Sequence, residues 1–472
     1  MGRVSGHNRV QSTSSVALDD DILRYLMWFL DRKELLALMM TCHALYSMGI
    51  PALLALPIVV GGYINLVSFC DFMYRDLAHR TRCLKRLSID ILHASDAQRG
   101  GCVVYEANPP EETMRGIIEV FYTAVSLEEL DITLNSCTLQ FYPQLSSALR
   151  MLPSVRVLGM VLEDGDTKEI VEIVSDMRPL DTLRLNVNTL DDISAKMIHR
   201  SQSLALRKLT VTRFTFTTPA SIRFPRLEYL DIKYDADVAL LTRLCPHIKH
   251  LHMSASWVDA DSIRARSMLA QAASPVWPEL EVVSGGLLPI YSLALRCQLA
   301  SLETDVERGR AGMFRTVLAD SLPRKLLLRV NWWMGSEPEL HFTQDDWNGF
   351  RSMFLDAPES LTEVTLKITL EMDALPLELF LAHIVAMCDP LEVAKLEISL
   401  HTTGPLMMWP GGKLDGGDHW KRLHAMNSAR FAQDIAEHII TLSEFSLVLP
   451  PDIISQWKIR RHQGAVMMQL LD

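Results

Sequence analysis

One short segment holds the densest group of possible metal ligands in the sequence: CPHIKHLHM, with Cys245, His247, His250 and His252. Thiolate and imidazole groups are ligands that zinc prefers. If HLHM is a strand with Leu251 and Met253 facing inwards, His250 and His252 share its open face. Two histidines at this spacing could bind a metal, and two polar residues facing solvent give the same pattern. We favour the second interpretation and expect no metal site.

Motifs of the common catalytic and phosphate-binding sites are missing from the sequence. It contains no GxxxxGK[ST], no GxSxG and no HExxH. The segment GGKLDGG surrounds Lys413 with glycines. A phosphate-binding loop also needs a Ser or Thr after the lysine and a strand before it, so we interpret this segment as an exposed loop. No nucleophile, base and orienting residue form a recognisable group. We therefore expect a protein that is not an enzyme and that uses no cofactor.

The composition favours an ordered protein. The chain has 472 residues, 49% hydrophobic and 22% charged, with a formal net charge of −11. Nucleic-acid binding needs clustered Lys and Arg, so the acidic balance argues against it. The eight cysteines are scattered and form no CxxC pair, which indicates reduced thiols. Residues 1–15 are polar and lack the apolar core of a signal peptide, so we expect a disordered tail and a cytoplasmic or nuclear protein.

Residues 35–70 contain no Asp, Glu, Lys or Arg. A transmembrane helix needs roughly 20 consecutive apolar residues. Pro51, Pro57 and the pair Gly61-Gly62 interrupt this run, so we expect no membrane segment. Its lack of charge is better explained by burial: up to Leu56 it completes a helical domain, and residues 57–83 form a junction with a short strand and a helix.

The first fifty residues predict three short helices. Apolar residues recur at helical spacing from Leu18 onwards, after which Asp31 and Glu34 form a capping-box pattern for a second helix. A third helix begins near His43 and runs towards Leu56. So small a bundle cannot bury all of its apolar side chains internally. We therefore expect the surplus to be covered by a partner or by the following domain.

This stretch resembles an F-box. The matching positions are Leu18, Ile22, Leu23, Leu26, Leu30, Asp31, Leu35 and Cys42, and Asp21 stands where the family has Glu. Asp19 and Arg32 depart from the pattern, because the family usually has Pro at both positions. The resemblance implies that a Skp-type linker subunit binds at Leu18, Asp19, Ile22, Leu23, Leu26, Leu30 and Leu35. The other interpretation is an ordinary helical cap on the domain that follows.

From Leu84 onwards a motif of the form L-x-x-L-x-L recurs, and we call the first residue of each copy its anchor. It begins at residues 84, 127, 155, 180, 206, 227 and 248, with weaker copies at 280, 361 and 393. Between 127 and 280 these anchors are 21 to 32 residues apart, close to the period of about 20–29 residues found in leucine-rich repeats. Prolines precede seven anchors by one to three residues and stop the helix before each strand. These prolines are Pro153, Pro179, Pro225, Pro246, Pro278, Pro358 and Pro390.

The chain therefore resembles divergent F-box proteins with leucine-rich repeats, including those abundant in mushroom-forming fungi. The expected fold is α/β: a leucine-rich-repeat solenoid (horseshoe) over residues 84–472, preceded by a small all-α F-box-like domain at 16–56. We expect loop insertions near 93–112 and 404–424. The repeated motif is hard to place between about 299 and 345.

The resemblance implies a substrate-receptor adapter of a cullin–RING (SCF-type) ubiquitin ligase. Its partners would be the linker subunit and an unidentified target protein, with no nucleic acid and no membrane. We expect the target on alternate, outward-facing strand positions: Glu129, Asp131, Arg184, Asn186, Lys208, Thr210, Tyr229, Asp231, Lys233, His250 and His252. The alternative is a repeat scaffold for protein interactions whose degenerate F-box no longer recruits a ligase.

Overall fold

The computed structural model consists of two units. The first comprises Met1–Val161 with Asp176–Arg178, and the second Leu162–Ser175 with Pro179–Asp472. The structure describes residues 19–91, 110–162, 167–187, 193–194, 198, 200–212, 214–215, 222–233, 238–254, 259–273, 277–278, 280–307, 309–332, 344–370, 377–402, 423, 425–449, 453–463 and 465–471. The predicted tail, Leu18, Lys413 and most of both predicted loop insertions lie outside the described residues.

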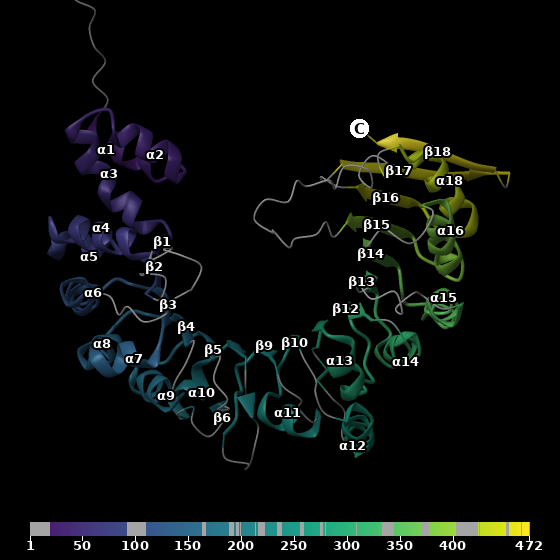
Figure 1. Ribbon diagram of the computed structural model, residues 1–472, viewed down its shortest axis with the longest axis horizontal. Helices are drawn as coiled ribbons and strands as arrows, with labels where there is room; N and C mark the ends of the chain where they lie inside the picture. The colour runs from purple at the N-terminus through teal and green to yellow at the C-terminus, as the bar shows by residue number, and fades with distance from the viewer. Residues whose placement is uncertain are drawn as a thin grey trace, which may run out of the picture. The chain divides into compact units, whose positions relative to one another are not determined.

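The first unit begins with three helices and continues with alternating strands and helices (Figure 1). Its elements are α1 (Asp20–Met27), α2 (Arg32–Met39), α3 (His43–Ala55), β1 (Ile58–Gly61), α4 (Tyr63–Tyr74), α5 (Leu77–Cys83), β2 (Arg86–Asp90), α6 (Glu111–Thr123), β3 (Glu129–Leu134), α7 (Ser136–Phe141), α8 (Pro143–Arg150) and β4 (Val157–Leu162). The three predicted N-terminal helices and the strand and helix predicted for the junction are confirmed.

Local sequence explains where these first helices begin. Asp19 caps α1 by accepting a hydrogen bond from the backbone N–H of Asp21 at 3.2 Å. The capping box predicted for α2 is present: Asp31 accepts from the N–H of Glu34 at 2.8 Å, and Glu34 accepts from the N–H of Asp31 at 3.1 Å. Both bonds pair N–H groups that a helix start otherwise leaves without a partner.

The second unit alternates strands and helices over most of its length. Its elements are α9 (Thr167–Asp176), β5 (Thr182–Val187), β6 (Ile193–Ser194), α10 (Arg200–Ala205), β7 (Lys208–Val211), β8 (Phe214–Thr215), β9 (Tyr229–Ile232), α11 (Val238–Leu244), β10 (His250–Met253), α12 (Ala260–Ala273), β11 (Val282–Gly285), α13 (Leu287–Leu293), β12 (Ser301–Val306), α14 (Ala311–Ser321), β13 (Lys325–Trp332), α15 (Gln344–Arg351), β14 (Glu363–Leu370), α16 (Leu377–Cys388), β15 (Lys395–Thr402), α18 (Ser428–His438), β16 (Glu444–Leu449), β17 (Ile453–His462) and β18 (Ala465–Leu471).

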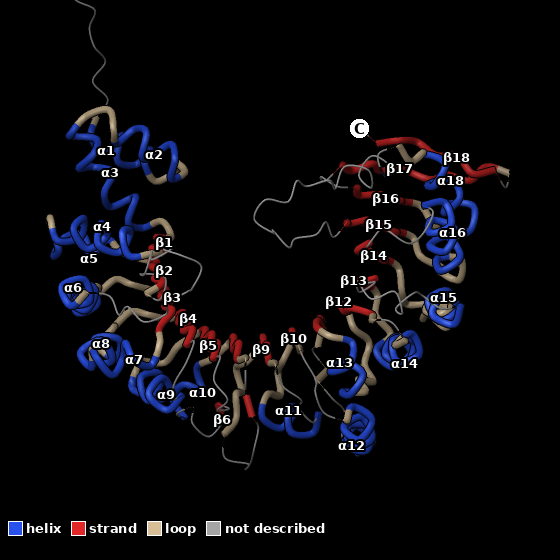
Figure 2. Tube along the Cα trace, in the orientation of Figure 1, coloured by secondary structure: helices blue, strands red, loops and turns tan. Residues whose placement is uncertain are grey.

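In this unit the strands from β5 to β16, apart from β6 and β8, pair in parallel in sequence order. Figure 2 shows the helices α11 to α16 along one side of these strands. Leucine-type residues of each strand face that side and are buried, whereas the alternate residues stay partly exposed. The unit is therefore a mixed α/β structure whose strand–helix alternation is compatible with a solenoid.

The recurring motif correctly predicted the strands that follow its anchors. A strand begins two residues after each of the ten predicted anchors, and every anchor is buried. Three further strands, β12, β13 and β16, begin two residues after Leu299, Pro323 and Leu442. Two of them, β12 and β13, lie between 299 and 345, where the repeat was not clear from the sequence, and all three pair in parallel with the preceding strand. The chain then departs from the predicted repeat, because β17 and β18 form an antiparallel hairpin beside β16.

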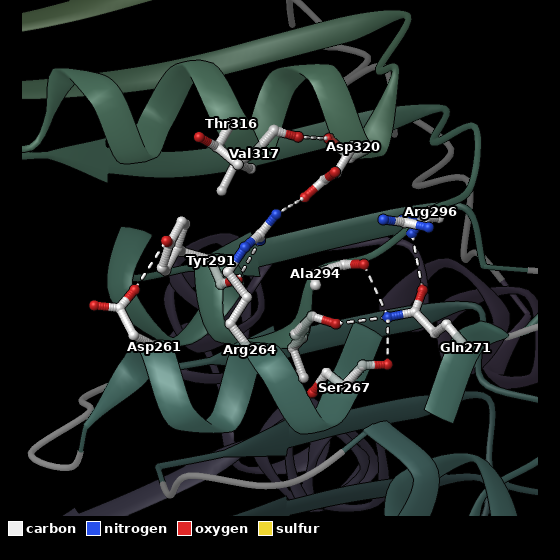
Figure 3. A network of polar contacts seen from close by, with 12 residues as sticks. Asp261, Arg264, Ser267, Gln271, Tyr291, Ala294, Arg296, Thr316, Val317 and Asp320 are labelled. Carbon is white, nitrogen blue, oxygen red and sulfur yellow. Dashed lines mark hydrogen bonds and ion pairs between the residues drawn. The ribbon is translucent and has the colours of Figure 1, made fainter. Parts of the chain in front are cut away.

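A polar network connects the helices α12, α13 and α14 (Figure 3). Arg264 Nη2 lies 2.5 Å from Asp320 Oδ2, and its guanidinium lies 4.5 Å from the centre of the Tyr291 ring. The Tyr291 hydroxyl donates to Asp261 at 2.9 Å. Further along α12, Gln271 donates to the carbonyl oxygens of the α13 C-terminus. These contacts fix the helices that pack behind β11 and β12.

Within the described part of the chain, every helix is too short or too polar to cross a membrane.

Candidate protein-binding sites

Helices α1 and α2 carry large apolar side chains on their surface, which we call the N-terminal apolar face. Tyr25 and Phe29 are 65% and 68% exposed, and their rings contact each other at 4.9 Å between centroids. Met40 is 85% exposed. The whole face consists of Ile22, Tyr25, Leu26, Trp28, Phe29, Leu36 and Met40. Large exposed apolar side chains concentrated on two short helices mark a protein interaction site more often than scattered ones do.

The opposite side of these helices forms the core that holds the face in place. Met27, Leu35 and Met39 are buried, and α3 packs so closely on Met39 that a Cβ atom at Gly49 has no room. Six residues predicted to bind the linker subunit can be located: Asp19, Ile22 and Leu26 are exposed, Leu23 and Leu30 are half-buried, and Leu35 is buried. Leu35 therefore supports the face from beneath.

Five residues of the face were absent from the predicted linker-binding residues: Tyr25, Trp28, Phe29, Leu36 and Met40. Tyr25 lies one helical turn from Phe29, and that i, i+4 spacing between aromatic residues was the signal available. Trp28 and Met40 sit at the C-terminal caps of α1 and α2. Their exposure depends on where each helix ends, which helical spacing alone does not give.

The backbone accommodates both departures from the F-box pattern. Asp19 has φ −62°, inside the range of about −65 ± 15° that the proline ring imposes. Arg32 is the first residue of α2, a position where proline is favoured because its missing N–H would be unpaired there. The Arg32 guanidinium also donates to the carbonyl oxygen of Pro57. Asp and Arg thus occupy proline-compatible positions and add a cap and a side-chain hydrogen bond.

The open strand face of the second unit carries polar residues in rows across neighbouring strands. Strand register brings seven predicted target-binding residues into two rows. The first row contains Lys208, Tyr229 and His250, and the second contains Arg184, Thr210, Asp231 and His252. Asn186 is half-buried near the end of β5, and Lys233 is exposed immediately after β9. Adjacent strands lie about 4.8 Å apart, so each row places its side chains within reach of one another.

In the first row, Tyr229 and His250 form an aromatic pair. Their ring centroids are 6.3 Å apart, and the rings are tilted by 36°. Burial raises the pKa of the Tyr229 hydroxyl, and the neighbouring Asp231 carboxylate raises it further. Tyrosine therefore stays neutral here and offers both a ring and a hydrogen-bonding hydroxyl, the combination that makes this residue common in interface hot spots.

The second row continues from Asp231 and His252 to Ser284 on β11. His252 Nδ1 lies 2.8 Å from Ser284 Oγ. Burial raises the pKa of the Asp231 carboxyl, although His252 and Lys233 lower it in part. These residue types also form nucleophilic relays, but β10 pairs on both sides and its backbone N–H groups are used within the sheet. The row therefore offers hydrogen-bonding side chains on the open face.

Farther along the unit, opposite charges on the open face neutralise each other. Lys325 pairs with Glu363 at 2.8 Å, and Lys395 pairs with Glu444 at 2.8 Å. Arg329 pairs with Glu303 in the same way. None of these residues was among the predicted site residues, because the sequence prediction covered only earlier strands. Their charges are therefore compensated within the sheet.

In the first unit the predicted residues Glu129 and Asp131 lie on β3, opposite Arg86 and Ser88 of β2. Both are half-buried. At the beginning of these strands, Lys85 pairs with Glu128 at 2.7 Å. That bond lowers the pKa of the Glu128 carboxyl. The open face of β2 and β3 is therefore polar, as the alternation of apolar and polar residues along these strands predicted.

The possible metal ligands of CPHIKHLHM do not lie together. Cys245 is buried, its carbonyl oxygen accepts a hydrogen bond from Trp277 Nε1 at 2.7 Å, and burial raises the pKa of its thiol. His250 and His252 lie on the open face, as predicted, and His247 is exposed before the strand. Among the residues that the structure describes, no three His, Cys, Asp or Glu side chains are arranged to hold a metal ion.

A comparison with known protein families and with curated proteins finds no match for this chain.

Proposed function

We propose that this chain is a substrate-receptor adapter of a cullin–RING ubiquitin ligase. In this proposal the helices at residues 16–56 act as an F-box and bind a Skp-type linker subunit, while leucine-rich repeats bind a target protein. The observation that carries the proposal is the N-terminal apolar face, with Tyr25 and Phe29 more than half exposed. A soluble partner that covers this face would remove a large apolar area from water.

The proline-compatible backbone at Asp19 and Arg32 supports the F-box interpretation. The repeat interpretation is supported by the constant offset of two residues between each anchor and its strand. For the target, the polar rows around Tyr229 combine an aromatic pair with hydrogen-bonding side chains on the open face. Tyr and Arg are enriched among residues that dominate binding energy, so Tyr229 and Arg184 are the proposed anchors.

The adapter itself would catalyse nothing and would hold no cofactor. Its role is proximity: binding the target and the linker at once raises the local concentration of target lysines near the ubiquitin carrier. Such an adapter would work in the cytoplasm or the nucleus, where cullin–RING ligases act.

A pull-down with the purified linker subunit tests the proposal. The double variant Leu23→Ala, Leu26→Ala removes apolar contacts from α1 and should lose linker binding, because truncating a hot-spot residue costs about 2 kcal/mol or more. The matched control is Leu269→Ala with Ile440→Ala, which truncates two exposed aliphatic residues of the second unit. The control should bind as the wild type does, and both variants should keep the wild-type circular dichroism spectrum.

If the wild-type chain fails to bind any Skp-type linker, the alternative of a repeat scaffold without ligase recruitment replaces the proposal. If the double variant unfolds the chain, the three helices serve as a structural cap on the domain that follows.

A further inference from the structure

A pocket of about 470 Å³ lies where the strands β7, β9 and β10 begin. It is lined by Arg207, Pro225, Arg226, Glu228, His247 and Lys249. Three successive strand-and-turn segments contribute to it, and the pocket falls in the range of about 300–1,000 Å³ that is usual for ligand sites. It lies at the edge of the strands, beside the first row of the open face.

The pocket is cationic within an acidic chain. Three of its residues are Arg or Lys and one is Glu, whereas the whole chain carries a net charge of −11. Arg207 Nη2 donates to Glu228 Oε1 at 3.0 Å. That hydrogen bond lowers the pKa of the Glu228 carboxyl, and the charges of Lys249 and His250 lower it further. The single carboxylate is therefore compensated from both sides.

Arg226 and His247 stay available for a ligand. Their side chains make no hydrogen bond or ion pair with the residues that the structure describes, and both are exposed. A guanidinium presents its N–H groups in a planar fork that matches the two oxygens of a carboxylate or the oxygens of a phosphate.

The backbone holds these side chains at fixed spacing. The carbonyl oxygen of Arg207 accepts from the N–H groups of Glu228 and Tyr229, and that of Glu228 accepts from Lys249 and His250, three of the four bonds measuring 2.9 Å. The backbones of neighbouring segments are therefore held at strand spacing, about 4.8 Å, which fixes the positions from which these side chains extend.

We propose that this pocket binds an oxyanion carried by an acidic segment of another protein. The pocket is larger than a single carboxylate or phosphate group requires, and Pro225 adds an apolar wall, so the ligand is an anionic side chain with its flanking residues. Glu228 and Lys249 directly precede Tyr229 and His250, so a bound segment continues onto the first row. A nucleic acid is disfavoured, because the net charge of −11 repels a polyanion. The site does not depend on linker binding.

Fluorescence polarisation with the full chain tests this site without any ligase component. Three labelled peptides of one length are compared, containing a run of glutamates, of phosphoserines or of glutamines. The glutamate or the phosphoserine peptide should bind, the glutamine peptide should not, and rising salt should weaken binding. Tighter binding of one anionic peptide identifies its oxyanion as the natural group, carboxylate or phosphate.

The double variant Arg226→Gln, Lys249→Gln should weaken binding at least about tenfold, because charge-assisted hydrogen bonds are lost. The control Arg296→Gln, Arg430→Gln removes the same charge outside the pocket and should bind like the wild type. Three outcomes overturn the proposal: equal binding of all three peptides, equal loss in both double variants, or tighter binding of a single-stranded oligonucleotide than of either anionic peptide. An unchanged melting temperature in both variants excludes unfolding as the cause.

Discussion

At the scale of single residues, packing sets the protonation state of His383 on α16. Its ring stacks on Trp347 of α15, with centroids 3.9 Å apart. Its Nδ1 accepts from Arg351 Nη2 at 2.8 Å, which is possible only when Nδ1 carries no proton. Burial and then the Arg351 charge lower the pKa of His383 from its ordinary value of 6.5. The folded state therefore favours neutral imidazole.

A pH dependence of stability follows. Because the pKa of His383 is lower in the folded state than in the unfolded state, the unfolded state binds the proton first as the pH falls below about 6.5. The free energy of unfolding should therefore fall as the pH decreases from about 7 to about 5, with a slope of at most about 1.4 kcal/mol per pH unit from one proton. Urea unfolding across this range measures it.

His383→Gln keeps a polar group but cannot titrate, so its unfolding free energy should fall less steeply than that of the wild type. His462→Gln, at an exposed position, serves as the control and should keep the wild-type slope. If His383→Gln and the wild type have the same slope, packing of this residue does not set its protonation.

At the scale of elements, the network of Figure 3 contains one ion pair, between α12 and α14, that water hardly reaches. The side chains of Arg264 and Asp320 are 11% and 18% exposed. Removing one partner of such a pair leaves the other charge without compensation in a largely dry site, which costs more than the pair itself contributes.

Asp320→Ala should therefore lower the free energy of unfolding by about 3 kcal/mol, measured by urea unfolding at neutral pH. The double variant Arg264→Met, Asp320→Leu replaces the pair by apolar side chains and should recover most of that loss. Glu111→Ala breaks the exposed pair with Arg115 and should cost only about 0–1 kcal/mol. A loss in Asp320→Ala no larger than in Glu111→Ala would contradict the role given to this pair.

The sequence predicted the parallel strands well because a buried leucine-type anchor and its period are local signals. It missed the parallel strands β12, β13 and β16, of which β13 has Pro323 in place of the aliphatic anchor, and it did not predict the antiparallel pairing of β17 and β18. Aligning the anchors of successive strands also gives the rows of neighbouring residues, such as Asp231, His252 and Ser284. The pocket at Arg226 could not be predicted, because its walls come from turns whose geometry depends on packing.

On the scale of the whole molecule, we assign two different binding roles to the two units. Polar rows on the open face of the second unit are proposed to bind the target, with Arg184, Tyr229 and Asp231 among the contacting residues. The triple variant Arg184→Glu, Tyr229→Ala, Asp231→Lys should lose target capture while keeping linker binding and the melting temperature. Proximity labelling, compared with the wild type, measures capture.

The control for this variant is Lys367→Glu with Glu397→Lys, on the open face of β14 and β15. It alters charge on the same face away from the proposed rows and should keep capture. If the triple variant captures its target as the wild type does, the site moves to the segments 93–112 or 409–422.

The central claim is that the N-terminal apolar face binds a Skp-type linker subunit, and calorimetric titration of the purified linker into the full chain tests it most directly. We expect saturable one-to-one binding to the wild type. The variant Ile22→Asp, Phe29→Asp should bind at least about a hundredfold more weakly, because charges enter a desolvated contact, whereas Leu269→Asp, Ile440→Asp should bind normally. Absence of binding to the wild type, or equal affinity for the Ile22→Asp, Phe29→Asp variant, would contradict the account.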